Sequence, residues 1–412
     1  MLLPVRQPKP SDALTLPPDV LLRIEDLRTY FPLMEGTVKA VDGASLTLRR
    51  GRTLAVVGES GCGKSVMARS VMQIVDRPGR IVSGRMLYRR QAGGSGPNGA
   101  NGADGQSGAD GQSGAAPDVV DLATLSPGGA EIRAIRGEEI AMVFQEPMTS
   151  FSPVHTVGSQ IAEAIRLHHA VTKQEARERT IDMLRRVGMP RPERHVDEYP
   201  HQISGGMRQR AMIAMALSCS PQLLIADEPS TALDVTTQAQ IMELMLQLKD
   251  EMGMSIMLIT HDLAVVAEMA DDVAVMYLGR VVEQADVEAL FHDAKHPYTQ
   301  ALLRSIPQLG RPVERLEVIR GMVPDPYNRP AGCTFHPRCR FGIRGLCNRI
   351  EPPAVDVAPG RQVRCLLYGG AGDAPDTAAA VGARVARMAH LQAGGAGNGA
   401  AGAAVGGGAD AR

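Results

Sequence analysis

The residues that decide the fold are Gly58-Glu59-Ser60-Gly61-Cys62-Gly63-Lys64-Ser65, which fit the pattern G-x-x-x-x-G-K-[ST] at every fixed position. The apolar residues 54–57 come directly before this stretch and predict a buried strand, and residues 66–75 after it are compatible with a helix. Its glycines let backbone N–H groups turn inward toward phosphate oxygens. The stretch therefore predicts a phosphate-binding loop between a strand and a helix.

Two side chains of this loop have expected roles. Lys64 would reach the β- and γ-phosphates of a nucleotide, and the Ser65 hydroxyl would bind Mg²⁺. The positive end of the following helix adds to the attraction for phosphate. Cys62 occupies a variable position, where we expect a small filler side chain. A chance glycine-rich turn is the alternative, and the strand and helix on either side argue against it.

A second chemical feature is an acidic pair at the end of a predicted strand. The apolar residues 223–226 are followed directly by Asp227 and Glu228. Adjacent carboxylates are costly in a core, but they suit a Mg²⁺ site where the strands of an α/β sheet end. We expect Asp227 to hold the metal through water and Glu228 to act as general base on the attacking water. An exposed strand end that begins a turn at Pro229 is the alternative.

A third motif is Ser204-Gly205-Gly206, which precedes a helical run at 211–218 and predicts an anion-binding helix start. Together with the loop and the acidic pair, it makes the sequence resemble the ATP-binding-cassette (ABC) ATPases. Their signature usually reads LSGGQ, and this chain has Ile203 to Met207 in its place. The form SGGMRQR is typical of peptide importers within that family.

The resemblance assigns further residues of the ATP site. Gln145 is similar to the Q-loop glutamine, which touches Mg²⁺ and senses the transmembrane partner, and Asp234 belongs to a D-loop at 231–234. His261 resembles the H-loop histidine that donates to the γ-phosphate. The adenine-stacking aromatic is expected at Phe31 rather than at its neighbour Tyr30. Taken singly, a polar residue after a strand is more often a turn or a helix cap.

The order of the predicted elements indicates an α/β fold of the P-loop NTPase cassette type. It has a mainly parallel sheet with flanking helices, an antiparallel β subdomain and an inserted helical subdomain at 147–220. The expected ATPase domain covers 20–290 and includes a low-complexity insertion at 93–116, which is too polar to bury. A small Cys-rich C-terminal domain is expected at 291–368. Residues 1–19 and the Gly/Ala-rich tail at 369–412 are expected to be disordered.

Four cysteines cluster late in the chain, at Cys333, Cys339, Cys347 and Cys365. In a chain without a secretory leader, such a cluster more often binds metal than forms disulfides. Residues 296–303 and 332–339 resemble the dipeptide and oligopeptide importer ATPases, which implies a [4Fe–4S] cluster. Spacing alone leaves Zn²⁺ and a reduced, metal-free set open. His336 is expected to cap a turn rather than to bind metal.

Composition limits the function classes. The formal net charge is −1 and only 3% of residues are aromatic, which disfavours nucleic acid as a partner. The sequence has no apolar run long enough to span a membrane and no apparent signal peptide, so a membrane role would require partners.

The resemblance implies such partners: a second ABC ATPase subunit in a head-to-tail dimer (with itself or a sister chain), two transmembrane permeases and, indirectly, a solute-binding protein. The expected function is ATP hydrolysis that drives uptake of di- or oligopeptides, as a peripheral protein on the cytoplasmic face of the cell inner membrane. Nickel, glutathione or another small solute is the alternative cargo. A soluble ABC ATPase without transport is the alternative of another class.

Overall fold

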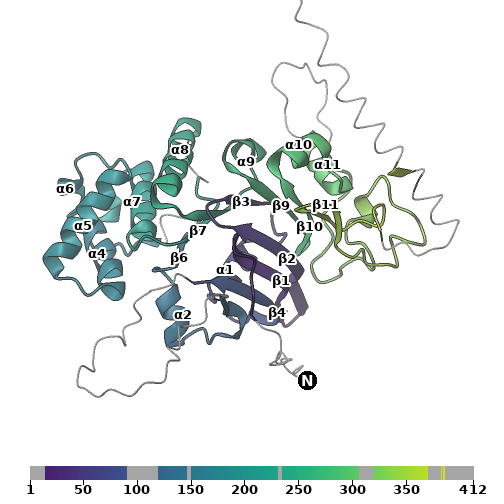
Figure 1. The fold of residues 1–412 in the computed structure, drawn as a ribbon, viewed down its shortest axis with the longest axis horizontal. Helices are drawn as coiled ribbons and strands as arrows, with labels where there is room; N and C mark the ends of the chain where they lie inside the picture. Colours follow the sequence, from purple (N-terminus) through teal and green to yellow (C-terminus); the bar gives the residue numbers. More distant parts are fainter. Residues whose placement is uncertain are drawn as a thin grey trace, which may run out of the picture. The chain divides into compact units, whose positions relative to one another are not determined.

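The computed structural model describes residues 14–90, 119–145, 150–230, 234–305 and 319–369, together with 382, 384 and 385. The predicted insertion at 93–116 lies outside the described residues, and so do most of the predicted N-terminal and C-terminal disordered segments and D-loop residues 231–233. The chain divides into two compact units (Figure 1). Unit 1 comprises Met1–Val287 and Asp325–Tyr327, and unit 2 comprises Glu288–Pro324 and Asn328–Arg412.

Unit 1 contains a four-stranded antiparallel sheet in the order β2-β1-β4-β5. Its strands are β1 (Val20–Leu33), β2 (Gly36–Arg49), β4 (Arg80–Arg89) and β5 (Val119–Asp121). The first two strands form a long hairpin in which Leu33 pairs with Gly36, with several register shifts along its length. Buried and exposed residues alternate along much of β2, as expected for strands with one face on the core. The predicted antiparallel β subdomain is confirmed.

The second sheet of unit 1 is mainly parallel and runs in the order β10-β9-β3-β8-β7-β6. Its strands are β3 (Thr53–Val57), β6 (Ile140–Val143), β7 (Leu223–Asp227), β8 (Ser255–Ile259), β9 (Asp272–Tyr277) and β10 (Arg280–Asp286). Only β10 pairs antiparallel with its neighbour. Every residue of the five parallel strands is buried. This burial explains why each strand is a mainly apolar run, with polar residues only at strand ends (Thr53, Asp227, Ser255 and Asp272).

Helices cover the parallel sheet and build the helical subdomain. They are α1 (Lys64–Val71), α2 (Ala130–Ile135), α4 (Val157–His168), α5 (Lys173–Arg186), α6 (Pro192–His195), α7 (Gly205–Leu217), α8 (Val235–Met252) and α9 (Leu263–Met269), with 3₁₀ turns η1 (Leu122–Thr124) and η2 (Pro200–Gln202). Several begin at a side-chain cap. Thr172 and Glu175 form a reciprocal capping box at the start of α5, and Asp234 accepts from the N–H of Thr237 at the start of α8.

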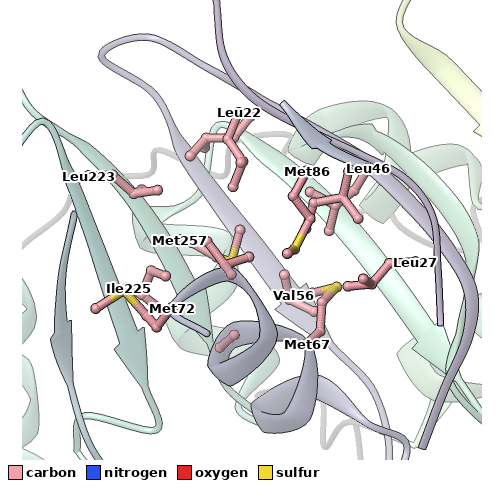
Figure 2. Close-up of a cluster of buried hydrophobic side chains, with 14 of the residues drawn as sticks. Leu22, Leu27, Leu46, Val56, Met67, Met72, Met86, Leu223, Ile225 and Met257 are labelled. Carbon is pink, nitrogen blue, oxygen red and sulfur yellow. The ribbon is translucent and has the colours of Figure 1, made fainter. Parts of the chain in front are cut away.

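Two apolar clusters hold unit 1 together. In the first, α1 packs between the two sheets, and Figure 2 shows Met67 of α1 beside Val56 and Leu27. Met72, which follows the last residue of α1, lies beside Ile225. The second cluster joins the helices α4, α5, α7 and α8 to the other face of the parallel sheet. The first cluster is positioned directly behind the phosphate loop, so the loop rests on a close-packed base.

Unit 2 is smaller. It contains α10, which begins at the boundary (Val287–Asp293), α11 (Pro297–Arg304), the 3₁₀ turn η3 (His336–Arg338) and a hairpin of β11 (Val355–Ala358) and β12 (Arg361–Val363). Its small core includes Phe341, Val363, Cys365 and Leu367. The four clustered cysteines all belong to this unit. The small Cys-rich C-terminal domain expected at 291–368 stays a prediction.

No helix of the described ranges is both long and apolar enough to cross a membrane.

Several helices begin earlier than predicted. The run expected at 66–75 is α1, which begins at Lys64 and ends at Val71, and the run expected at 211–218 begins at Gly205. The cause lies in the caps. Gly63 adopts a left-handed conformation before α1, and the Ser204 side chain accepts from the N–H of Met207. Apolar periodicity begins only where a helix meets the core, so it misses a first turn that faces a ligand site.

Candidate nucleotide-binding site

A cavity of about 470 Å³ opens at the carboxyl ends of the parallel strands. It is lined by Ala40, Ser60, Gly61, Gly63, Lys64, Ser65, Val66, Gln145, Glu228 and His261. The phosphate loop follows β3, Gln145 follows β6, Glu228 follows β7 and His261 follows β8. Parallel strands place their carboxyl ends at one edge of a sheet, which is where α/β proteins bind ligands. The fold thus brings together side chains that are far apart in the sequence.

The phosphate loop fits its surroundings only because glycines stand at two close contacts. A Cβ at Gly58 would lie 2.2 Å from the carbonyl oxygen of Met276, and one at Gly63 would lie 2.2 Å from the carbonyl oxygen of Ala40. Gly63 also has φ of 100°, which other residues rarely adopt. Strands β2 and β9 therefore press directly on the loop and define its shape.

Lys64 is the last residue but one of the phosphate loop, and its side chain is buried. Its ammonium group donates to the carbonyl oxygens of Gly58, at 2.9 Å, and Glu59, at 3.3 Å. These carbonyls hold the charge at the mouth of the loop, next to the start of α1. A cation and a helix N-terminus at one point make a strong attraction for phosphate.

The Ser65 hydroxyl and Asp227 meet across the site. Ser65 Oγ donates to Asp227 Oδ1 at 2.9 Å. Burial raises the pKa of the Asp227 carboxyl above its usual value, while the Ser65 hydrogen bond and the nearby Lys64 charge act in the opposite direction. A hydroxyl and a carboxylate so close together are oxygen ligands of the kind that Mg²⁺ prefers.

Glu228 is held by three contacts at the edge of the cavity. Gln145 Nε2 donates to Glu228 Oε2 at 2.9 Å, and His261 Nδ1 lies 3.4 Å from Oε1. The backbone N–H of Glu228 donates to the carbonyl of Ile259, and its φ is 48°. Backbone strain of this kind persists where the surroundings impose it, and it is common at active sites. These contacts fix the position of Glu228, which lines the cavity.

Not all the predicted residues meet in this cavity. Ser204 and Gly205 are exposed at the start of α7, outside the cavity lining, and Gly206 packs against Thr237 of α8. Asp234 caps α8. The signature motif Ser204-Gly205-Gly206 therefore does not line the cavity formed by the phosphate loop of the same chain.

Six other residues named from the sequence also lie outside the lining: Gly58 and Asp227, described above, and Tyr30, Phe31, Glu59 and Cys62. The Phe31 ring packs near Gly79 and Val75, and the Tyr30 hydroxyl donates to Asp42 Oδ1. Cys62 is 3% exposed and its thiol belongs to the apolar core, as expected for a filler. Glu59 contributes its carbonyl to Lys64.

The sequence reasoning missed Ala40 and Val66, which line the cavity with apolar surface. No pattern marks them, because the role of Ala40 depends on how closely β2 approaches the loop.

The four cysteines of unit 2 form no disulfide bonds with one another in the structure. Burial, together with the charges of the neighbouring Cys333 and Cys347, raises the pKa of the Cys339 thiol to about 12. The same two causes, burial and the charges of the other three, raise the pKa of Cys365. Among the residues that the structure describes, however, no three His, Cys, Asp or Glu side chains form a group that could hold a metal ion. The predicted metal site is therefore not confirmed.

His336 contacts the backbone of a turn, in line with the turn-capping role predicted for it. Its Nδ1 lies 2.9 Å from the carbonyl oxygen of Cys333, and it is the first residue of η3.

The sequence matches two family models. One, described as ABC transporter, covers residues 41–231, and the other, described as oligopeptide/dipeptide transporter C-terminal region, covers residues 282–347. The chain is 44% identical to the dipeptide transport ATP-binding protein DppD of Escherichia coli over 345 residues, which span 84% of this chain and 96% of that protein. It is 46% identical to a probable peptide ABC transporter ATP-binding protein of Sinorhizobium fredii, over 84% of this chain and 95% of that protein.

The fold agrees with these matches. The ATP-binding cassette MJ0796, solved as a dimer bound to ADP and phosphate, superposes with a TM-score of 0.52 at 23% identity, over 65% of this chain and 99% of that one. The cbiO1 subunit of a Clostridium perfringens ABC transporter superposes with a TM-score of 0.50 at 27% identity, over 67% of this chain and 92% of that one. With the P-loop, the acidic pair and the signature motif on one cassette, this chain belongs to the ATP-binding proteins of the ABC transporter family, in the group that carries the oligopeptide/dipeptide transporter C-terminal region.

Proposed function

We propose that this chain is the ATP-hydrolysing subunit of an importer that takes up di- or oligopeptides. The observation that carries the proposal is the meeting of Lys64, Gln145, Glu228 and His261 in one cavity of a chain that also has the C-terminal region of oligopeptide transporters. Relatives named as dipeptide and peptide import ATP-binding proteins support the cargo class.

The roles of the residues follow from their positions. Lys64 would bind the β- and γ-phosphates, and Ser65, Asp227 and Gln145 would hold Mg²⁺, which neutralises phosphate charge when bound with ATP. Glu228 would take the proton from the attacking water, because its carboxylate is the one that faces the cavity. His261 would donate to the γ-phosphate. Phe31 would stack on adenine.

The site would be completed by a second subunit. Ser204 and Gly205 form an exposed helix start with an N-terminal positive end, outside the chain's own cavity. In a head-to-tail pair, this start would face the phosphate loop of the partner, and Asp234 would lie near the same interface. ATP would then close the pair, and hydrolysis would reopen it. The pair would dock through the helical subdomain on two permeases, at the cytoplasmic face of the cell inner membrane.

A strain that lacks this chain tests the cargo. It should lose uptake of a labelled dipeptide, and wild-type protein, but not the Glu228→Gln variant, should restore it. Labelled nickel and glutathione, measured in parallel, separate the peptide from the alternative cargoes. If uptake of nickel or glutathione falls and dipeptide uptake does not, the cargo assignment is wrong. If none of the three changes, the result favours the non-transport ABC ATPase.

For the four cysteines we propose an iron–sulfur cluster on the family resemblance. Four cysteine thiols in one unit fit in number and chemistry, since a bound metal would favour the thiolate forms of Cys339 and Cys365, whose pKa values are raised without it. Their positions do not form an assembled ligand set. Protein purified without oxygen should contain iron and absorb near ~400 nm. Stoichiometric zinc without iron would show that the cysteines bind Zn²⁺ instead. A metal-free, colourless preparation would show that they bind no metal.

A further inference from the structure

The tip of the β1–β2 hairpin is exposed to solvent, since residues 33–35 are all exposed. Strand β1 ends at Leu33 and β2 begins at Gly36, and Met34 between them is fully exposed. A two-residue connection between long strands is prone to fraying unless another segment packs on it.

A short segment from much later in the chain packs on this tip. Asp325–Tyr327 belongs to unit 1, although the residues before and after it belong to unit 2. The Tyr327 hydroxyl donates to Glu35 Oε2 at 3.2 Å. The ring lies against the hairpin backbone, with its Cδ1 only 3.2 Å from where a Cβ of Gly36 would be. The Tyr327 side chain therefore contacts both the polar and the backbone surface of the tip.

The segment itself is ordered by a local turn. The Asp325 carboxylate accepts a hydrogen bond of 2.8 Å from the backbone N–H of Tyr327, which is the geometry of an Asx turn. The ring is thus presented in a defined direction before it meets the hairpin.

The hairpin leads from this contact to the nucleotide cavity. Four residues along β2 from Gly36, Ala40 lines the cavity, and its carbonyl oxygen presses on Gly63 of the phosphate loop. On β1, Phe31 pairs with Val38 of the same hairpin. The tip, the Ala40 wall of the phosphate loop and Phe31 therefore lie on the same pair of hydrogen-bonded strands.

We propose that Tyr327 is a positioning residue for the nucleotide site, which holds the tip of the β1–β2 hairpin and thereby raises the affinity for ATP. The inference rests on the proposed nucleotide site. It gives the C-terminal part of the chain a direct effect on ATP binding, through a side chain that touches neither the nucleotide cavity nor the acidic pair.

The full-length chain with Tyr327→Ala tests it. The KM for ATP and the Kd of a fluorescent ATP analogue should rise about three- to fivefold, as expected for the loss of one exposed hydrogen bond and a ring contact, while kcat changes less than twofold. Backbone amides at 33–38 should exchange hydrogen faster. Tyr327→Phe keeps the ring and should change KM less than Tyr327→Ala does, and Glu35→Ala, which removes the acceptor, should match Tyr327→Phe.

Met322→Ala is the matched control, because Met322 is 89% exposed and lies close to Tyr327 in the chain. Its KM and exchange rates should equal those of the wild type. If Tyr327→Ala leaves KM, Kd and exchange at wild-type values, or lowers kcat at constant KM, the inference is wrong. A wild-type chain that fails to bind the analogue would instead refute the proposed nucleotide site, and the exchange measurement would still report on the hairpin contact.

Discussion

Ser65 donates a hydrogen bond of 2.9 Å to Asp227, across 162 positions of sequence. This pair joins the phosphate loop to the strand end that carries the acidic residues, at the point where Mg²⁺ would bind. Because both side chains already converge there, the metal would find its ligands in place at a low cost in conformational entropy.

Removal of the Ser65 hydroxyl should weaken the binding of Mg²⁺ more than the binding of ATP. For Ser65→Ala, we expect the Mg²⁺ concentration for half-maximal ATP hydrolysis to rise about tenfold or more. Ser60→Ala is the control, since Ser60 lines the same cavity while the hydrogen bond to Asp227 comes from Ser65. An unchanged Mg²⁺ dependence in Ser65→Ala would show that the hydroxyl is not a ligand.

The ionised carboxylate of Asp227 should lower the stability of the folded, metal-free protein at neutral pH. Burial raises its pKa in the folded state, so the folded protein holds this proton more tightly than the unfolded chain. Its contribution to stability is then greatest below the unfolded pKa and is lost as pH rises through the folded pKa. Asp227→Asn should therefore raise the melting temperature by about 2–4 °C at pH 7 without Mg²⁺.

The gain from Asp227→Asn should shrink as pH falls through the raised pKa of the folded carboxyl, and it should vanish below the ordinary aspartate pKa of ~4. Thermal unfolding at several pH values measures it. A variant that melts below the wild type at pH 7 would contradict the sign.

Pairing of two chains can be tested with two inactive variants. Lys64→Ala damages the phosphate loop and Ser204→Arg blocks the signature helix start. If one active site takes its loop from one copy and its signature from the other, a mixture of the two variants contains pairs with one intact site. We expect the mixture to recover about a quarter of the wild-type ATPase rate, for random pairing in a two-fold symmetric dimer.

Neither variant alone should show more than background activity. Lack of recovery in the mixture would exclude a pair of this chain with itself and leave a sister ATPase as the partner.

His296 should make unit 2 sensitive to acid. Its Nδ1 accepts from the N–H of Tyr298 at the start of α11, and burial lowers the pKa of its ring to about 3. The unfolded chain therefore takes up a proton near pH ~6.5 that the folded state excludes, and stability is lost as pH falls below that value. At pH 5 the loss should be about 2 kcal/mol.

The variant His296→Asn keeps a helix-capping side chain but does not titrate, so its stability should depend less on pH between 7.5 and 5. Hydrogen exchange of the α11 amides measures this. His292→Asn is the control, because the His292 side chain is 80% exposed. An equal pH dependence in wild type and His296→Asn would contradict the assignment.

Much of this site could be predicted from the sequence, because its residues follow buried parallel strands. The apolar runs before Gly58, Asp227 and His261 identify strands β3, β7 and β8, and parallel strands place the residues after their carboxyl ends at one edge of the sheet. The positions of Lys64, Glu228 and Gln145 result from that rule together with their motifs.

The features that could not be predicted depend on tertiary contact. Ala40 lines the cavity because β2 presses on Gly63, and the left-handed backbone of Glu228 results from its bond to the Ile259 carbonyl. Neither the approach of β2 to Gly63 nor the backbone conformation of Glu228 produces a recognisable pattern in the sequence. The contact of Tyr327 with Glu35 joins segments 292 positions apart, and local propensity carries no information about such a pairing.

The catalytic role of Glu228 is tested most directly by a comparison of ATP binding and ATP hydrolysis in the Glu228→Gln variant. Glutamine keeps the size and the hydrogen-bonding capacity of the side chain but cannot act as a base. We expect the Kd for ATP to stay within about twofold of the wild-type value while hydrolysis falls by at least about 100-fold. Hydrolysis close to the wild-type rate in this variant would contradict the assignment of Glu228 as the base.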